Sequence, residues 1–375
     1  MNVFVFGSSI LSSYWNGAAT YYRGIYKYLA RRGHSITFAE PDAYGRQEHR
    51  DNGDYSYVSS LVYKPCVDVD RMLAQSARAD VVIKHSGLGA DDALLESRLP
   101  ELQTRSAVIF WDVDAPATIE RLLADEHDPL HVAIPRYDAI FTYGGGPAIR
   151  DAYLRLGARA YHSIYNGLDP ETHHPVPPDP EFSCDLLFLG NRLPDRERRV
   201  EELFLRAAEM APGKRFALGG EGWSDKAIPP NVRRIGHVGT EDHNRMNCSA
   251  GMVMNLNRSS MASTGFSPPT RVFEAAGAAV CMLCDDWPGL DEFFSSGSEI
   301  LIVRSAQDVV DALENHGAAA RRRIGDAFYA RALAEHTYSR RAELAEQAFL
   351  ACLRAKYVPA AVSRLAPTAL VEESA

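Results

Sequence analysis

The chain has 375 residues, a length that suits two domains of ordinary size better than one. Its composition, 46% hydrophobic, 10% aromatic and 24% charged, is that of a folded globular protein and excludes long disorder and a disulfide-held miniprotein. A net charge of -9, from 40 basic and 49 acidic residues, argues against nucleic acid and an anionic membrane surface as partners. No apolar run approaches the roughly 20 residues of a membrane span, so no transmembrane segment is expected.

The cysteines and the N-terminus indicate a cytoplasmic protein without a metal site. Six cysteines are scattered without the spacing of a disulfide framework, and the first residues lack the basic start and cleavage site of a signal peptide. Cys281 and Cys284 form a single CxxC inside an apolar run, which favours a buried strand over zinc. His173 and His174 adjoin in a proline-rich segment and predict no metal site.

The first half of the chain alternates strand and helix patterns. Residues 3–6 form a short apolar run, 7–17 are rich in Gly, Ser and Asn, and a helical pattern extends from Ala18 to a glycine cap at Gly33. Further strands are predicted at 35–39, 81–83, 107–110 and 139–141, and the last three each precede a polar or Gly-rich loop and a helical pattern. This alternation predicts a doubly wound parallel sheet.

A proline-rich segment separates this half from a second α/β half. Residues 170–180 contain five prolines, which can continue neither a helix nor a central strand. Strands are predicted beyond it at 185–190, 215–219, 251–255, 279–283 and 299–303, with a helix over 195–210. We therefore expect a first domain at 1–169, a linker at 170–182, a second domain at 183–345, and a C-terminal helix returning to the first domain, plus a tail, within 346–375. Ligands of two such domains bind in the cleft between the carboxyl ends of their sheets.

Several common catalytic signatures are missing from the sequence. No strand-to-helix turn reads GxGxxG, and neither GxxxxGK[ST] nor GxSxG occurs. Oxidoreductases with a dinucleotide fingerprint, Walker-type ATPases and serine hydrolases with a nucleophile elbow therefore lose support.

The segment 263–277 carries the strongest local signal. Ser267 suits a helix N-cap and Pro268 the first helical position, which places Arg271 and Glu274 on one face of the opening turns. Free backbone N–H groups and Arg271 would suit a diphosphate, and the Glu274 carboxylate can accept hydrogen bonds from both hydroxyls of a ribose. The alternative is an ordinary Arg–Glu pair on a surface helix.

Three arginines follow strands at the same predicted sheet edge. Arg192 and Arg196 come after the first strand of the second half, and Arg258 follows the strand ending at Asn255. Each is a candidate to neutralise a phosphate. A charged surface helix start is the alternative, and it is favoured more for Arg196 than for Arg192, which lies in the loop itself.

Polar residues also follow the strands of the first half. Asp112 and Asp114 come after a buried strand and suit sugar hydroxyls or a general base, although an Asx turn or N-cap explains Asp114 equally well. His85 has the same strand-end placement, with a structural histidine as its alternative. The glycines around Gly145 would allow backbone to approach a ligand closely.

Nine segments, in this order along the chain, resemble the CgeB-like family of predicted glycosyltransferases. They are WNGAATYYRG at 15–24, HRD at 49–51, FWDVDAPAT at 110–118, YGGG at 143–146, NGLDP at 166–170, LGNR at 189–192, NLNR at 255–258, SPPTRVFEAAG at 267–277 and DWPGLDEFF at 286–294. The resemblance spans residues 15–341. It implies the GT-B architecture, in which two Rossmann-like domains face a central cleft.

The resemblance further implies transfer of a sugar from a nucleotide-diphosphate donor, held by the C-terminal domain, to an acceptor held by the N-terminal domain. It implies a metal-independent reaction that retains configuration, and no cofactor besides the donor. The donor side would comprise Gly17, Arg192, His237, Val238, Arg258, Ser267, Thr270, Arg271 and Glu274. The acceptor side would comprise Asn16, Asp114 and Gly145, with Asp112 and His85 as catalytic candidates.

Two departures from the family pattern leave other functions open. A glutamate often lies eight residues before the ribose-binding one, where this chain has Phe266, and a histidine commonly follows the first Asn-Gly, where it has Ala18. A nucleotide-sugar epimerase with Asp112 and His85 as its acid and base, a phosphorylase, and a catalytically degenerate binding protein are the alternatives. The acceptor remains open among glycan, protein and small molecule.

Overall fold

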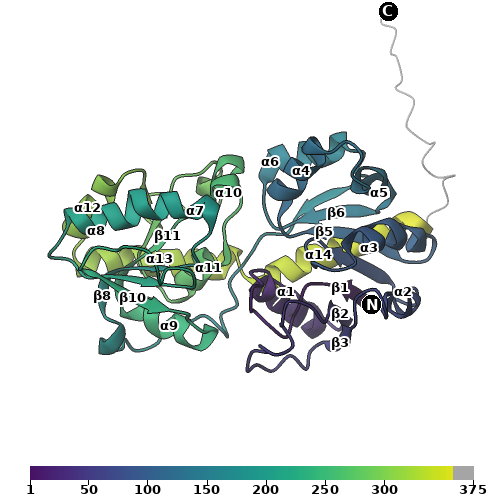
Figure 1. The fold of residues 1–375 in the computed structure, drawn as a ribbon, viewed down its shortest axis with the longest axis horizontal. Coiled ribbons are helices and arrows are strands. Elements are labelled where there is room, and N and C mark those ends of the chain that lie inside the picture. The colour runs from purple at the N-terminus through teal and green to yellow at the C-terminus, as the bar shows by residue number, and fades with distance from the viewer. Residues whose placement is uncertain (358–375) are drawn as a thin grey trace, which may run out of the picture.

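The computed structural model describes residues 1–357, apart from the side chains at 240 and 241, and it consists of two α/β domains (Figure 1). Each domain contains one parallel sheet covered by helices, as the alternating sequence pattern predicts. No helix within the described residues is long and apolar enough to cross a membrane. All six cysteines are free thiols.

The N-terminal sheet has seven parallel strands in the order β3-β2-β1-β4-β5-β6-β7. These are β1 (Asn2–Phe6), β2 (Ser35–Pro41), β3 (Ser59–Tyr63), β4 (Val81–His85), β5 (Ala107–Asp112), β6 (Ala139–Thr142) and β7 (Tyr161–Ser163). Its helices are α1 (Ala19–Arg31), α2 (Val69–Ser76), α3 (Asp92–Arg98), α4 (Ala115–Ala124), α5 (Leu130–Ala133) and α6 (Gly146–Arg155). The central strands β4, β5 and β6 are wholly buried, which explains their continuous apolar sequence.

The C-terminal sheet has six parallel strands in the order β10-β9-β8-β11-β12-β13. These are β8 (Cys184–Leu189), β9 (Phe216–Gly219), β10 (Val232–Gly236), β11 (Ala250–Asn255), β12 (Met282–Asp285) and β13 (Leu301–Val303). Its helices are α7 (Pro194–Arg199), continued by a π-helical turn to α8 (Arg206–Met210), α9 (Thr240–Ser249), α10 (Ser259–Thr264), α11 (Thr270–Gly277), α12 (Ala306–Asn315) and α13 (Ala318–Glu335). In each sheet the chain adds strands first on one side of the first strand and then on the other. This strand order is typical of a doubly wound dinucleotide-binding fold.

The final helix belongs to the N-terminal domain. Helix α14 (Tyr338–Tyr357) begins before residue 346 and runs along α1 (Figure 1). The two helices approach closely because α1 has glycine at Gly24, where a Cβ atom would lie 2.5 Å from the Tyr338 ring. The Phe349 ring stacks on Phe141 of β6 at 5.8 Å. The expected tail beyond 357 lies outside the described residues.

The chain crosses between the domains twice, and the two crossings are hydrogen-bonded to each other. The Leu168 N–H donates to the His336 carbonyl at 2.7 Å, and the Tyr338 N–H donates to the Leu168 carbonyl at 2.9 Å. A Cβ atom at Gly167 would lie 2.9 Å from the same His336 carbonyl oxygen, so glycine allows this close approach. The domains are therefore joined by two hydrogen-bonded segments, one at Leu168 and one at residues 336–338, which we call the hinge.

Candidate functional site

A large cleft of about 2370 Å³ lies between the carboxyl ends of the two sheets. It reaches the points where each sheet reverses, at Ser8 and Ser86 in the N-terminal domain and at Gly190 in the C-terminal domain. Such switch points are where doubly wound sheets bind ligands. The volume exceeds the roughly 300–1,000 Å³ of a typical small-molecule site, so the cleft has room for two substrates.

The C-terminal wall is built around the first turn of α11, which begins later than the sequence pattern predicts. Ser267 and Pro268 do not start this helix, because Pro268 precedes a second proline and a residue before proline is disfavoured in helical geometry. The helix starts at Thr270, which lines the cleft. The prediction that Ser267 is the N-cap is therefore wrong. Its side chain is 1% exposed, donates to the Gly265 carbonyl at 3.0 Å, and does not line the cleft.

Two arginines converge at the end of β8. A Cβ atom at Gly190 would lie 2.8 Å from Nη2 of Arg271 and 3.1 Å from Nη1 of Arg196, so both guanidinium groups meet where glycine leaves space. Arg271 donates to the Leu189 carbonyl and, at 2.9 Å, to the Asn255 side chain. Arg196 donates to the Asn191 carbonyl at 3.3 Å, and its buried Nε has no partner.

These two guanidinium groups carry a charge that no described carboxylate neutralises by direct contact. All the hydrogen bonds of Arg196 and Arg271 go to carbonyl or amide oxygens. Burial, followed by repulsion from Arg271, lowers the pKa of Arg196 to about 9. An unpaired buried cation is unfavourable unless an anion joins it. The end of β8 therefore has the charge and the exposed geometry that could hold an anion.

Arg192, which the sequence favours over Arg196, points elsewhere. Its guanidinium pairs with Glu197 at 2.7 Å and with Asp225 at 2.9 Å, and it does not line the cleft. The prediction that Arg192 faces the cleft is corrected, because Arg196 lines the cleft and Arg192 does not. The ion pairs with Glu197 and Asp225 hold the Arg192 guanidinium away from the cleft.

Glu274 lines the cleft one turn into α11, near two histidines. Its Oε2 lies 3.6 Å from Nδ1 of His243, and its side chain is 12% exposed. Burial raises the pKa of Glu274, but His243, His173 and Arg271 outweigh burial and leave the pKa below its usual value. The carboxylate is therefore ionised at neutral pH and open to a hydroxyl donor from the cleft.

The loop after β10 supplies the remaining part of this wall. His237 and Val238, which the resemblance implies for the donor side, line the cleft together with Gly219 and Gly220. Gly220 has φ 122°, a backbone conformation that glycine adopts readily and other residues rarely adopt. A Cβ atom there would lie 2.8 Å from the Asn191 nitrogen. Glycine at this position therefore lets the loop after β9 pack closely against the loop after β8.

Arg258 lines the cleft but already has two carboxylate partners. It donates from Nε to Asp195 of its own domain at 2.8 Å and from Nη1 to Asp114 of the N-terminal domain at 3.0 Å. The donor and acceptor candidates Arg258 and Asp114 thus bind each other across the domain boundary. This pair holds the two walls of the cleft together.

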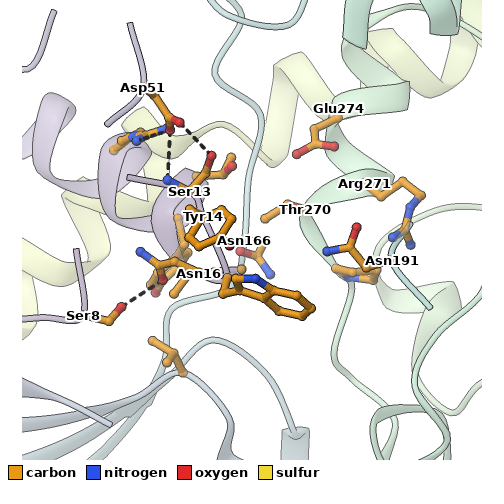
Figure 2. A pocket seen from close by; sticks show the side chains of 18 of the residues that line it. Ser8, Ser13, Tyr14, Asn16, Asp51, Asn166, Asn191, Thr270, Arg271 and Glu274 are labelled. Carbon is orange, nitrogen blue, oxygen red and sulfur yellow. Dashed lines mark hydrogen bonds and ion pairs between the residues drawn. The ribbon is translucent and has the colours of Figure 1, made fainter. Parts of the chain in front are cut away.

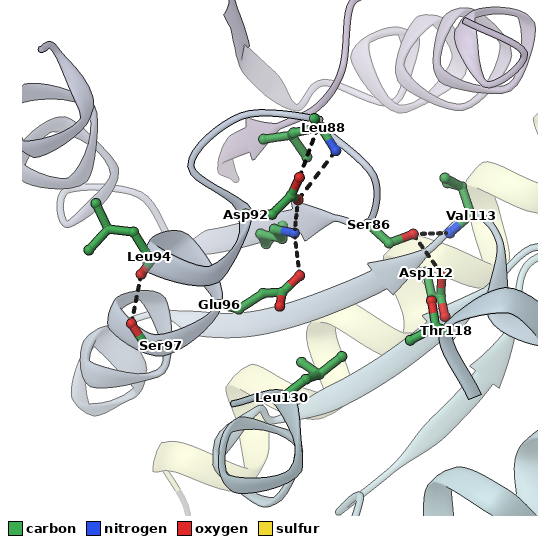
Figure 3. Close-up of polar contacts among 12 residues, drawn as sticks. Ser86, Leu88, Asp92, Leu94, Glu96, Ser97, Asp112, Val113, Thr118 and Leu130 are labelled. Carbon is green, nitrogen blue, oxygen red and sulfur yellow. Dashed lines mark hydrogen bonds and ion pairs between the residues drawn. The ribbon is translucent and has the colours of Figure 1, made fainter. Parts of the chain in front are cut away.

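The two catalytic candidates of the N-terminal domain lie behind the cleft wall. Asp112 is fully buried and accepts a hydrogen bond from Ser86 at 2.6 Å (Figure 3). It also accepts from the Tyr153 hydroxyl at 2.5 Å and from the Asp114 backbone N–H at 2.9 Å. His85 is fully buried, with Nε2 2.6 Å from the Tyr26 hydroxyl. Burial lowers the pKa of His85 to about 3. Both assignments as substrate-contacting catalytic residues are corrected to structural ones.

The N-terminal wall combines a polar loop with exposed aromatic rings. Asn16 lines the cleft beside Gly17 and is fixed by hydrogen bonds to Ser8 and to the backbone of the same loop. Trp15 is 65% exposed at φ 47°, and Tyr14 stacks on His49 at 4.0 Å. Figure 2 shows this loop and Glu274 on opposite sides of the pocket. An acceptor bound at this wall would meet aromatic surface.

Gly145 and Phe266 belong to the domain interface. The Gly145 N–H donates to the Phe266 carbonyl at 3.0 Å, and a Cβ atom at Gly146 would meet the Phe266 ring at 2.5 Å. Neither Gly145 nor Phe266 lines the cleft. The acceptor-side prediction for Gly145 is therefore corrected, because Gly145 and Phe266 contact each other across the domain boundary.

Comparison with known proteins places this architecture. Residues 196–347 match the model of a family described as glycosyl transferase-like. The structure of HepE from Anabaena with UDP-glucose is similar at 12% identity and a TM-score of 0.64, covering 94% of this chain and 100% of that one. Sucrose-phosphate synthase from Thermosynechococcus elongatus is similar at 13% identity and a TM-score of 0.67, covering 95% and 100%.

A third similar structure is an alpha-glucosyltransferase solved with UDP-glucose and DNA containing an abasic site, at 12% identity and a TM-score of 0.69, covering 93% of this chain and 99% of that one. No curated protein sequence matches the chain. The chain therefore has the GT-B fold, with two Rossmann-like domains facing one cleft. The family match falls within the C-terminal half, on the wall that contains Arg196, Arg271 and Glu274.

Proposed function

We propose that the protein is a glycosyltransferase of the CgeB-like type that moves a sugar, a hexose in our proposal, from a nucleotide-diphosphate donor to an acceptor. The observation that carries the proposal is the meeting of Arg196 and Arg271 at Gly190, unpaired, beside the ionised carboxylate of Glu274. Paired guanidinium groups suit a diphosphate and the carboxylate suits a ribose diol, so the wall matches the successive parts of one ligand. The loop at His237 and Val238 would take the base.

The chemistry follows from this placement. The bond between the anomeric carbon and the diphosphate oxygen breaks while a bond to an acceptor hydroxyl oxygen forms. In the retaining course, the departing diphosphate takes the acceptor's proton. Arg196 and Arg271 would stabilise the charge that develops on the leaving group, so we propose that this step needs no metal at the diphosphate. The domains would close on both substrates and exclude water.

The acceptor would bind at the N-terminal wall, where Trp15 and Tyr14 offer rings for an apolar or sugar face. A location in the cytoplasm is proposed because six free thiols suit a reducing compartment. The epimerase alternative has lost its acid and base, since Asp112 and His85 do not reach the cleft.

Thermal unfolding with UDP, GDP, dTDP, ADP and CMP tests the donor site. A diphosphate at about 100 times its Kd should stabilise the folded protein by about 2.7 kcal/mol. Glu274→Ala should remove most of that stabilisation, whereas Glu221→Gln, a change at an exposed acid lining the same cleft, should keep it. No stabilisation by any nucleotide, or equal stabilisation of the Glu274 variant, would contradict the proposal.

A further inference from the structure

Three side chains able to bind a metal meet where the interdomain segment touches α9 and α11. His173, His243 and Glu274 each offer one ligand atom, and these three atoms lie within 4.8 Å of one another. The two imidazole rings are 6.0 Å apart between centroids. His243 and Glu274 line the cleft, while His173 lies directly behind them with 2% exposure.

The imidazoles in this cluster lack the hydrogen bonds that buried rings normally make. Both ring nitrogens of His173 and Nδ1 of His243 are buried without a well-formed hydrogen bond among the described residues, and the Asn244 side chain is a neighbour close enough to interact with His173. A neutral imidazole carries one N–H donor and one acceptor, and buried polar atoms of this kind almost always find partners. The nitrogens and the nearby carboxylate are therefore a set of ligand atoms without a ligand.

The cluster is held in place by contacts outside it. The Asn244 side-chain amide, next to His243 on α9, donates to the Thr172 carbonyl at 2.8 Å and ties the segment before His173 to that helix. On α11, a Cβ atom at Gly277 would lie 2.6 Å from the His173 carbonyl oxygen, so glycine lets the segment pack one turn beyond Glu274. The three ligands thus come from three elements whose spacing is already set.

We propose that His173, His243 and Glu274 form a binding site for a zinc-type divalent cation, with its remaining coordination position open to the cleft. Two imidazoles and one carboxylate form a ligand set that suits Zn²⁺, with bonds of about 2.0–2.2 Å, whereas Mg²⁺ prefers oxygen ligands. Binding would draw the three ligand atoms, which now lie within 4.8 Å of one another, closer together around the cation. The cation would enter from the cleft, where His243 and Glu274 are exposed.

Zn²⁺ bound at this site would weaken binding of the nucleotide donor, an inference that rests on the proposed function. A cation bound to Glu274 takes the carboxylate proposed to hold the ribose. Zn²⁺ and nucleotide would then be antagonists. By linkage, each would weaken the other's binding by the same factor.

Calorimetric titration of the metal-free full chain with Zn²⁺ tests the site. We expect one Zn²⁺ per chain, no comparable binding of Mg²⁺, and at least tenfold weaker Zn²⁺ binding in His243→Ala and in Glu274→Gln. His237→Ala changes an exposed histidine of the same cleft and His174→Ala the neighbour of His173 in the chain, so both should bind Zn²⁺ as the unaltered protein does. Circular dichroism checks that each variant is folded.

The result that would overturn the site is the absence of Zn²⁺ binding, or binding that survives unchanged in the His243 and Glu274 variants. Titrations with UDP, GDP, dTDP and ADP, run with and without Zn²⁺, separate the two proposals. Zn²⁺ binding without binding of any of these nucleotides contradicts the proposed function alone. Nucleotide binding without Zn²⁺ binding contradicts the metal site alone.

Discussion

A Cβ atom on Gly144 would lie 2.9 Å from the Cβ atom of Ser267 across the domain boundary, and 3.0 Å from the Cα atom. Next to this contact, the Gly145 N–H donates to the Phe266 carbonyl. The glycines after β6 therefore allow the two walls of the cleft to meet backbone to backbone. The sequence presents these glycines as a ligand loop, whereas the structure uses them to set how far the cleft closes.

Gly144→Ala should push the domains apart. Because the added methyl group meets the backbone of Ser267, the chain cannot accommodate it by a side-chain rotation alone, and overpacking of this kind costs about 1–3 kcal/mol. We expect a larger radius of gyration by small-angle scattering. Gly213→Ala, at a position with open space, is the control, and equal scattering from both variants would contradict this role.

The ion pair between Arg258 and Asp114 should contribute to domain closure and little to overall stability. Both side chains are about one-third exposed, and exposed pairs contribute about 0.2–1 kcal/mol. A double-mutant cycle with Arg258→Ala and Asp114→Asn, read by urea unfolding, should give a coupling energy in that range that shrinks as salt is added. A coupling above 3 kcal/mol would show that the pair is a main support of the fold.

Asp112→Asn should reduce stability without weakening nucleotide binding. The amide of the variant cannot accept all the hydrogen bonds that the carboxylate accepts from Ser86, Tyr153 and the Asp114 backbone. Each hydrogen bond to a charged group contributes about 1.5–3 kcal/mol to the free energy of unfolding. Urea unfolding and UDP titration of the variant measure the two effects separately. Unchanged stability together with lost turnover would restore Asp112 as a catalytic residue.

Acid should destabilise the hinge through His336. Burial, helped by Arg341, lowers the pKa of His336 to about 4, whereas a histidine of the unfolded chain titrates near 6.5. Between these values the unfolded chain binds more protons, so the free energy of unfolding falls as the pH falls from 6.5 towards 4. The stabilisation that comes from keeping His336 neutral is therefore fully present only above about pH 6.5.

His336→Gln removes this titration and keeps an N–H donor for the Phe293 carbonyl, which His336 contacts at 3.0 Å. Between pH 7 and pH 5 the unaltered protein should lose roughly 2 kcal/mol more stability than the variant. Urea unfolding at the two pH values measures the difference. Parallel losses in the two proteins would show that another group dominates.

The sequence predicts the two doubly wound sheets because their central strands are continuous apolar runs between helical patterns. It misses the strands β3, β7 and β10, which are short and only partly buried and so lack such runs. It also places β12 too early, over 279–283, because the apolar run begins in the turn at Ala279, which has φ 53°.

The sequence predicts site residues whose relative positions are set by one helix. It does not predict those whose positions depend on which distant side chains they pair with. Arg271 and Glu274 lie on one short helix, so their spacing brings both to the cleft. Arg192 pairs with carboxylates whereas Arg196 does not, and local sequence does not reveal that pairing. The cluster of His173 with His243 and Glu274 joins three elements with no motif spacing, so the sequence alone predicted no metal site.

The most direct test of the donor site compares UDP binding by Arg196→Gln and Arg192→Gln in isothermal titration. Both changes remove one positive charge within the same five residues, but only Arg196 reaches Gly190, where we propose that the diphosphate binds. The account predicts at least tenfold weaker UDP binding for Arg196→Gln and nearly unchanged binding for Arg192→Gln. Equal losses, or a larger loss for Arg192→Gln, would contradict it.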